Sequence, residues 1–147
     1  MMSSYQYVYY FLAMTMYNTG TGILIFIVDD NIEILKMVQK RLNNENYMNV
    51  MAFSAFKEFY NTLHLKPGIV VLDNYLSKEQ NSIEESITNF KMVKKKLPET
   101  EFIILSGEDD KGTIHEFISS GAYGYIVKDT GSMDKLISSV RQISLRK

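Results

Sequence analysis

The sequence predicts an α/β fold, with a doubly wound sheet of five parallel strands and five helices. Short, continuous apolar runs recur along the 147-residue chain, and such runs are typical of strands that are buried on both faces. Between them lie segments in which apolar residues repeat at helical spacing. Strands that alternate with helices in this way form parallel sheets with helices on both faces.

The expected strands are mostly uninterrupted apolar segments. A less regular strand, the second along the chain, is expected within residues 47–53, where Met48, Val50 and Met51 supply the apolar side chains. The other four strands are residues 23–28, 69–72, 102–105 and 125–127.

One expected helix follows each strand. The first spans residues 31–42, Ser54 is expected to cap the second, and Ser82 opens the third with a capping-box sequence. Gly121 is expected to end the fourth helix. The apolar residues expected to face the core are Leu35, Val38 and Leu42, then Phe56, Phe59, Tyr60 and Leu63, then Ile83, Ile87, Phe90, Val93 and Leu97, then Ile114, Phe117 and Ile118, and finally Met133, Leu136, Ile137, Val140 and Ile143. This alternation makes a flavodoxin-like sheet.

Charged or hydroxyl-bearing residues follow four of the strands. Asp29 and Asp30 end the first strand, Asp73 the third, Ser106 the fourth and Lys128 the fifth. Each of them alone is more simply explained as a strand end in solvent. Because ligands bind at the carboxyl ends of the strands in an open α/β sheet, the whole set is better interpreted as one site.

The chemistry of such a site follows from its charges. Three crowded carboxylates repel one another, and at neutral pH they need a cation or raised pKa values. Ligands that are all oxygen favour a hard ion such as Mg²⁺. A metal-held carboxylate can act as the nucleophile that forms an aspartyl phosphate, and Lys128 and Ser106 would then have phosphate oxygens to hold.

With these residues and the stretch Gly121–Lys128, the chain resembles the receiver domain of two-component response regulators. The resemblance is to receivers like the chemotaxis response regulator. The resemblance covers about residues 23–145. It implies that Asp73 accepts a phosphoryl group from a histidine kinase or phosphotransfer protein. It also implies that Lys128 pairs with that group, that Ser106 hydrogen-bonds it, and that Tyr125 is an aromatic switch.

The resemblance also implies a Mg²⁺ site. Asp30 and Asp73 would be direct ligands together with the backbone carbonyl of Tyr75, and Asp29 would act mostly through water. The chain departs from the family after the acceptor, where Ser77 and Asn81 stand in place of the usual Pro and Gly.

The expected function is that of a cytoplasmic signalling switch, activated by phosphorylation. The chain would catalyse only its own Mg²⁺-dependent phosphorylation and dephosphorylation, without being a turnover enzyme. Its output would be a changed surface around His115, Tyr125 and Lys135 that binds a downstream protein or a second copy of the chain. The alternative is a receiver-fold interaction module that works without phosphorylation, which the unusual loop after Asp73 keeps open.

The length and composition of the chain exclude several other classes of function. A chain of this length forms one domain, and the absence of Cys excludes disulfides, thiolate catalysis and Cys-based zinc sites. A net charge of −1 gives no field that would favour nucleic acid or an anionic membrane. Whether the receiver stands alone or is cut from a longer protein is left open.

Residues 1–22 are expected to be an N-terminal extension of a receiver domain at 23–147. The apolar run in this extension is too short to span a membrane, and the positive start of a signal peptide is missing. Alternating aromatic residues at Tyr5, Tyr7, Tyr9 and Phe11 are compatible with a strand. An unstructured tail is an equal alternative.

Overall fold

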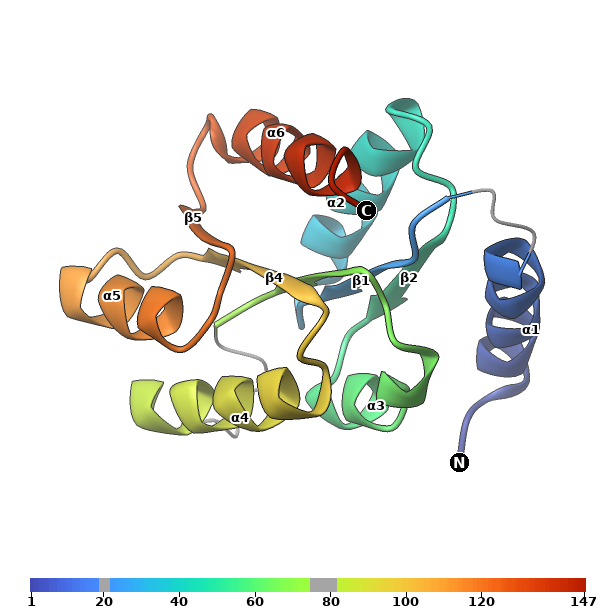
Figure 1. The fold of residues 1–147 in the computed structure, drawn as a ribbon, viewed down its shortest axis with the longest axis horizontal. Coiled ribbons are helices and arrows are strands. Elements are labelled where there is room, and N and C mark those ends of the chain that lie inside the picture. Colours follow the sequence, from blue (N-terminus) through green and yellow to red (C-terminus); the bar gives the residue numbers. More distant parts are fainter. Residues whose placement is uncertain (19–21, 75–81) are drawn as a thin grey trace.

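The computed structural model describes residues 1–18, 22–74 and 82–147. Strands and helices alternate along the chain from residue 25 onward, as the apolar patterns predict (Figure 1). The strands are β1 (Ile25–Val28), β2 (Val50–Phe53), β3 (Ile69–Leu72), β4 (Glu101–Ser106) and β5 (Gly124–Val127). The helices are α1 (Ser4–Asn18), α2 (Ile32–Asn44), α3 (Phe56–Tyr60), α4 (Ile83–Lys96), α5 (Lys111–Ser119) and α6 (Ser132–Ser144), with a short 3₁₀ helix at Leu63–Leu65.

The five strands form one parallel sheet in the order β2-β1-β3-β4-β5. Helices α2 and α6 cover one face of the sheet, and α3, α4 and α5 cover the other (Figure 1). The strand order reverses between β1 and β3, which is where ligands bind in sheets of this type. The predicted doubly wound α/β fold is therefore confirmed.

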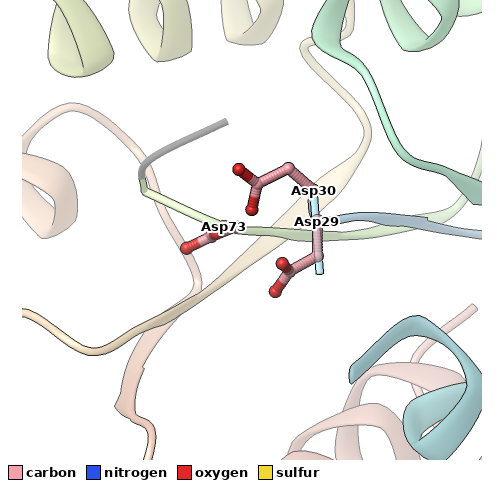
Figure 2. Close-up of side chains that lie close together, drawn as sticks. All are labelled: Asp29, Asp30 and Asp73. Atoms are coloured by element: carbon pink, nitrogen blue, oxygen red, sulfur yellow. The ribbon is translucent and has the colours of Figure 1, made fainter. Parts of the chain in front are cut away.

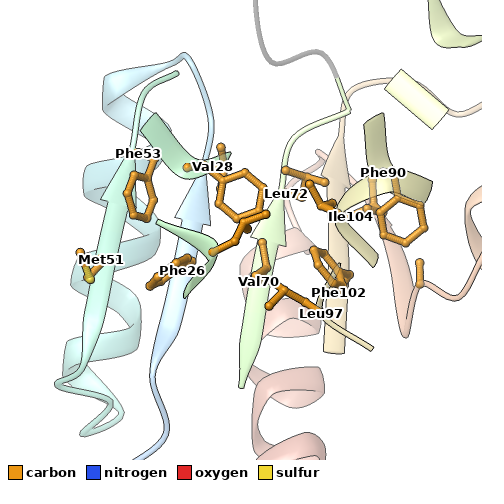
Figure 3. Packing of buried hydrophobic residues seen from close by; sticks show 14 of the residues in the cluster. Phe26, Val28, Met51, Phe53, Val70, Leu72, Phe90, Leu97, Phe102 and Ile104 are labelled. Carbon is orange, nitrogen blue, oxygen red and sulfur yellow. The ribbon is translucent and has the colours of Figure 1, made fainter. Parts of the chain in front are cut away.

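Successive strand residues are buried on alternate faces of the sheet. Phe26 and Val28 pack toward α3, α4 and α5, whereas Ile25 and Ile27 pack toward α2 and α6. Figure 3 shows the first of these clusters, in which the rings of Phe90 and Phe102 lie 5.4 Å apart, edge to face. Burial on both faces explains why the strands are continuous apolar runs rather than alternating ones.

The ends of two helices agree with the capping residues expected from the sequence. Ser82 caps α4, because its Oγ accepts a hydrogen bond from the Glu85 amide at 3.2 Å. Gly121 follows the end of α5 with φ of +106°, a conformation that favours glycine. The Gly121 and Ala122 amides donate to the Ile118 and Phe117 carbonyls, which is the Schellman arrangement.

Three details of the expected helices are wrong. Ala55, not Ser54, is the N-cap of α3, because the helix begins one residue later than a Ser54 cap requires, and its start has no side-chain cap. Leu63 is buried but lies in the 3₁₀ helix beyond the end of α3. Ile118 is 44% exposed, because the short helix α5 buries Thr113 and Phe117 instead.

The N-terminal extension contains a helix, so both the possible strand at Tyr5–Phe11 and the alternative of an unstructured tail are wrong for Ser4–Asn18. The described chain accordingly has α1 in addition to the five expected helices α2–α6. Helix α1 lies beside β2, the edge strand farthest from β5 (Figure 1). Tyr10 packs against the core, and its hydroxyl lies 3.3 Å from His64 Nε2. None of the described helices combines the length and the hydropathy needed to cross a membrane.

Candidate functional site

Three carboxylates meet at the carboxyl ends of β1 and β3. These two strands are neighbours with Val28 opposite Leu72, so the residues that follow, Asp29 and Asp73, emerge side by side. The Asp73 amide donates to the Val28 carbonyl at 2.9 Å, which fixes the strand end from which the acceptor candidate projects. Figure 2 shows the side chains of Asp29, Asp30 and Asp73 gathered at this point.

The donor set fits a hard divalent cation. Asp29, Asp30 and Asp73 each offer an oxygen, and these atoms all lie within 4.8 Å of one another. Asp29 and Asp73 are 2% and 7% exposed, whereas Asp30 is exposed, so a bound ion would also meet solvent. Carboxylates with room for water are the environment that Mg²⁺ prefers. The Tyr75 carbonyl expected to complete the site lies outside the described residues.

Lys128 places one cation against the two buried carboxylates. Its Nζ lies 2.9 Å from Asp29 Oδ2 and 3.4 Å from Asp73 Oδ1. The backbone at this point is held because the Lys128 amide donates to the Ser106 carbonyl at 2.7 Å. The expected convergence of the acidic strand ends and Lys128 is therefore observed.

These contacts favour the charged form of Lys128. Burial alone lowers the pKa of Lys128, but the hydrogen bond to Asp29 and the charges of Asp73 and Asp29 outweigh it. The pKa of Lys128 is consequently raised above its ordinary value of 10.5. Lys128 is thus a permanent cation at neutral pH, available to an anionic group at Asp73.

Ser106 and Tyr125 are connected through one backbone segment after β4. Ser106 is fully buried at the end of β4, and its Oγ accepts a hydrogen bond from the Glu108 amide at 3.1 Å. The Tyr125 hydroxyl donates to the Glu108 carbonyl at 2.8 Å, and its ring lies 5.8 Å from that of Phe117. Tyr125 therefore already lies inward and half-buried in this structure.

Asn74 is a neighbour of this switch pair that the sequence analysis did not identify. It directly follows Asp73 and is 2% exposed, and its Nδ2 donates to the Tyr125 hydroxyl over a long distance of 3.5 Å. Its side-chain oxygen is buried without a hydrogen-bond partner among the described residues. The position of Asn74 just after a buried strand was a local signal that it lies near the site. Its contact with Tyr125, 51 positions away, is visible only in the fold.

The expected output residues come from three adjacent elements. His115 lies on α5, Tyr125 on β5 and Lys135 on α6, and β5 is the edge strand between these two helices (Figure 1). His115 and Lys135 are exposed. The His115 Nε2 lies 3.3 Å from Ser119 Oγ, and the Lys135 ammonium lies 3.7 Å from Asp129.

Comparison with known proteins identifies the family. The model of the response regulator receiver domain matches residues 25–141, which is most of the chain. The chain belongs to this family. The receiver domain of DrrB, in its BeF3-activated form, is 26% identical and superimposes with a TM-score of 0.71, covering 86% of this chain and 99% of that one. A response regulator from Thermotoga maritima is 24% identical and superimposes with a TM-score of 0.72. The match covers 84% of this chain and 98% of the Thermotoga chain, and it shows that the two share a fold.

The receiver domain also has relatives among longer proteins. The oxygen regulatory protein NreC of Staphylococcus epidermidis is 29% identical over 121 residues, which are 81% of this chain and 53% of NreC. NreC of Staphylococcus aureus is 26% identical over the same length. The chain spans about half the length of these relatives. Residues 25–141 are therefore a receiver domain, which is a signalling module of two-component systems.

Proposed function

We propose that Asp73 accepts a phosphoryl group from a histidine kinase or phosphotransfer protein, and that this modification switches a protein-binding surface. One observation carries the proposal: two buried carboxylates, a third exposed one and a lysine surround a single point at the strand ends. Charges of both signs in this arrangement suit a divalent cation and a phosphoryl group bound together. We place this switch in the cytoplasm, as expected from the sequence.

Asp29, Asp30 and Asp73 are the residues that would hold Mg²⁺. When bound, Mg²⁺ supplies the positive charge that lets a carboxylate approach an anionic phosphoryl donor. In the transfer, an Asp73 carboxylate oxygen forms a bond to phosphorus while the bond from phosphorus to the donor breaks, and the donor leaves with that electron pair. Lys128 neutralises the phosphoryl oxygens, and the Ser106 hydroxyl donates to one of them. Positioning and charge neutralisation do most of the work.

Phosphorylation would be transmitted through Ser106 and Tyr125. When the Ser106 hydroxyl turns toward the phosphoryl group, its hydrogen bond with the Glu108 amide is lost, and the segment that also binds the Tyr125 hydroxyl is repositioned. That segment leads into α5, so the face around His115, Tyr125 and Lys135 changes. This face would bind the downstream protein or a second copy. A phosphorylation-independent module is not favoured, because the acidic cluster and Lys128 are all present.

Intact-mass spectrometry after incubation with acetyl phosphate tests the function. The expected result is a gain of one phosphoryl group in the presence of Mg²⁺ and no gain when Mg²⁺ is removed by EDTA. A chain that stays unmodified in both conditions, while a known receiver domain is modified in parallel, would favour the phosphorylation-independent module.

A further inference from the structure

Helix α1 presents an apolar stripe to solvent. Tyr5, Val8, Tyr9 and Leu12 follow one another at spacings of three and four residues and therefore share one side of the helix. Their side chains are 80%, 57%, 59% and 50% exposed. This set, called the α1 stripe below, has the spacing with which one helix packs against another.

The opposite side of α1 already faces the domain. Gln6 and Tyr10 are half-buried, and Tyr10 packs on the core and on His64, where the two rings lie 5.6 Å apart. The α1 stripe is thus part of the surface that stays exposed, together with Tyr7 and Phe11, after the helix has docked beside β2. A helix normally buries its apolar side, so a further surface is expected to cover the stripe.

The absence of charged residues in α1 indicates what kind of surface covers the stripe. Residues 1–22 contain no Asp, Glu, Lys or Arg, so α1 offers nothing to a strongly charged protein. It also lacks the basic side chains with which amphipathic helices bind lipid headgroups. Two copies of an uncharged face can meet without repulsion, and the same patch on both subunits satisfies a two-fold symmetric interface.

The exposed area suits a dimer. Two aromatic residues of the stripe, Tyr5 and Tyr9, are 80% and 59% exposed, and two that lie beside it on α1, Tyr7 and Phe11, are 56% and 70% exposed and can extend the contact. A buried aromatic side chain contributes about 150–250 Å², so these four offer about 400–660 Å². Val8 and Leu12 add to this, and a standard interface buries about 800 Å² per partner. Tyrosine is also among the residues that interfaces favour.

We propose that the α1 stripe is a homodimerisation surface, on which α1 of a second copy packs. Helix α1 and the output elements α5 and β5 lie at opposite ends of the molecule (Figure 1). Dimerisation through α1 therefore leaves the face around His115, Tyr125 and Lys135 free, and each copy keeps its own acidic site. The dimer does not depend on phosphorylation.

Sedimentation of the full chain over a wide range of protein concentration tests this proposal. The expected result is a dimer of twice the 17.0 kDa chain mass that forms already without Mg²⁺ and acetyl phosphate. The double variant Val8→Glu, Leu12→Glu should weaken self-association at least tenfold, because it places charges in an apolar interface. The matched variant Met37→Glu, Ile118→Glu, with both charges at exposed apolar positions on α2 and α5, should still dimerise.

Three outcomes would overturn the proposal. The wild-type chain could remain monomeric, the matched variant could dissociate while the α1 variant stays dimeric, or the wild-type monomer could bind phosphatidylcholine vesicles through α1.

Circular dichroism and the urea midpoint check that both variants fold, which is expected since all four positions are exposed. As a second measurement, Val8→Cys labelled with a spin label should show a distance between copies, because the chain has no other cysteine.

Discussion

The Lys128 ammonium lies 2.9 Å from the Asp29 carboxylate, closer than the 3.4 Å that separates it from Asp73. Asp29 is almost completely buried, so its charge needs a partner inside the protein. Lys128 therefore stabilises Asp29 while it stays within reach of the proposed acceptor. A phosphoryl group on Asp73 would compete with Asp29 for this cation.

The raised pKa of Lys128 predicts how its contribution to stability depends on pH. A lysine whose pKa is higher in the folded than in the unfolded state contributes fully below the unfolded value of 10.5, and the contribution is lost as pH rises through the folded value. The difference in unfolding free energy between wild type and Lys128→Met should be constant from about pH 8 to 10 and should then shrink. Urea titrations at each pH measure it, and a difference that already falls below pH 9 would contradict the raised pKa.

Removal of Asp30 should weaken metal binding. Asp30→Ala deletes one of the three clustered carboxylates, so a bound Mg²⁺ would lose an oxygen ligand and one of the negative charges that attract it. We expect the affinity for Mg²⁺ to fall at least tenfold, or about 1.4 kcal/mol or more, in isothermal calorimetry. Glu99→Ala removes an equal charge from an exposed position before β4, at the opposite edge of the sheet, and should leave the affinity unchanged. Equal affinities for the two variants would remove Asp30 from the metal site.

The Ser106–Glu108–Tyr125 connection should respond to an analogue of the phosphoryl group. Beryllofluoride, the activating group in the DrrB structure, should change amide hydrogen exchange across residues 107–125, because the Glu108 backbone amide and carbonyl bond the two switch residues Ser106 and Tyr125. Ser106→Ala should still be phosphorylated but should respond less. Identical exchange with and without beryllofluoride would refute this coupling.

The site at the carboxyl ends of the strands could be predicted from the sequence because the strands are buried on both faces. Parallel strands covered on both faces must be continuous apolar runs, so Asp29, Asp73 and Lys128 stand out as the first polar residues after them. Shared strand direction then brings these ends together, as the register of Val28 with Leu72 shows.

Features that depend on contacts distant in sequence could not be predicted. The link between Asn74 and Tyr125 joins positions that only the sheet brings close. In α1, the alternating tyrosines resembled a strand, but the same residues also place Tyr5, Val8, Tyr9 and Leu12 on one helical face. An uncharged segment gives no charge pairs to decide between the two patterns. The local signal for a helix was a capping box at its start, where the Ser3 Oγ accepts from the Gln6 amide and the Gln6 side chain accepts from the Ser3 amide. Packing of Tyr10 on the core accompanies the helix.

Phosphoryl transfer to Asp73 is tested most directly by substituting this residue alone. Asp73→Asn keeps the shape of the side chain but removes the nucleophilic carboxylate, and Asp109→Asn makes the same change at an exposed position. After incubation with Mg²⁺ and acetyl phosphate, intact-mass spectrometry should show one added phosphoryl group in wild type and Asp109→Asn, and none in Asp73→Asn. A single phosphoryl group that persists in Asp73→Asn would place the acceptor elsewhere and contradict the proposed role of the site.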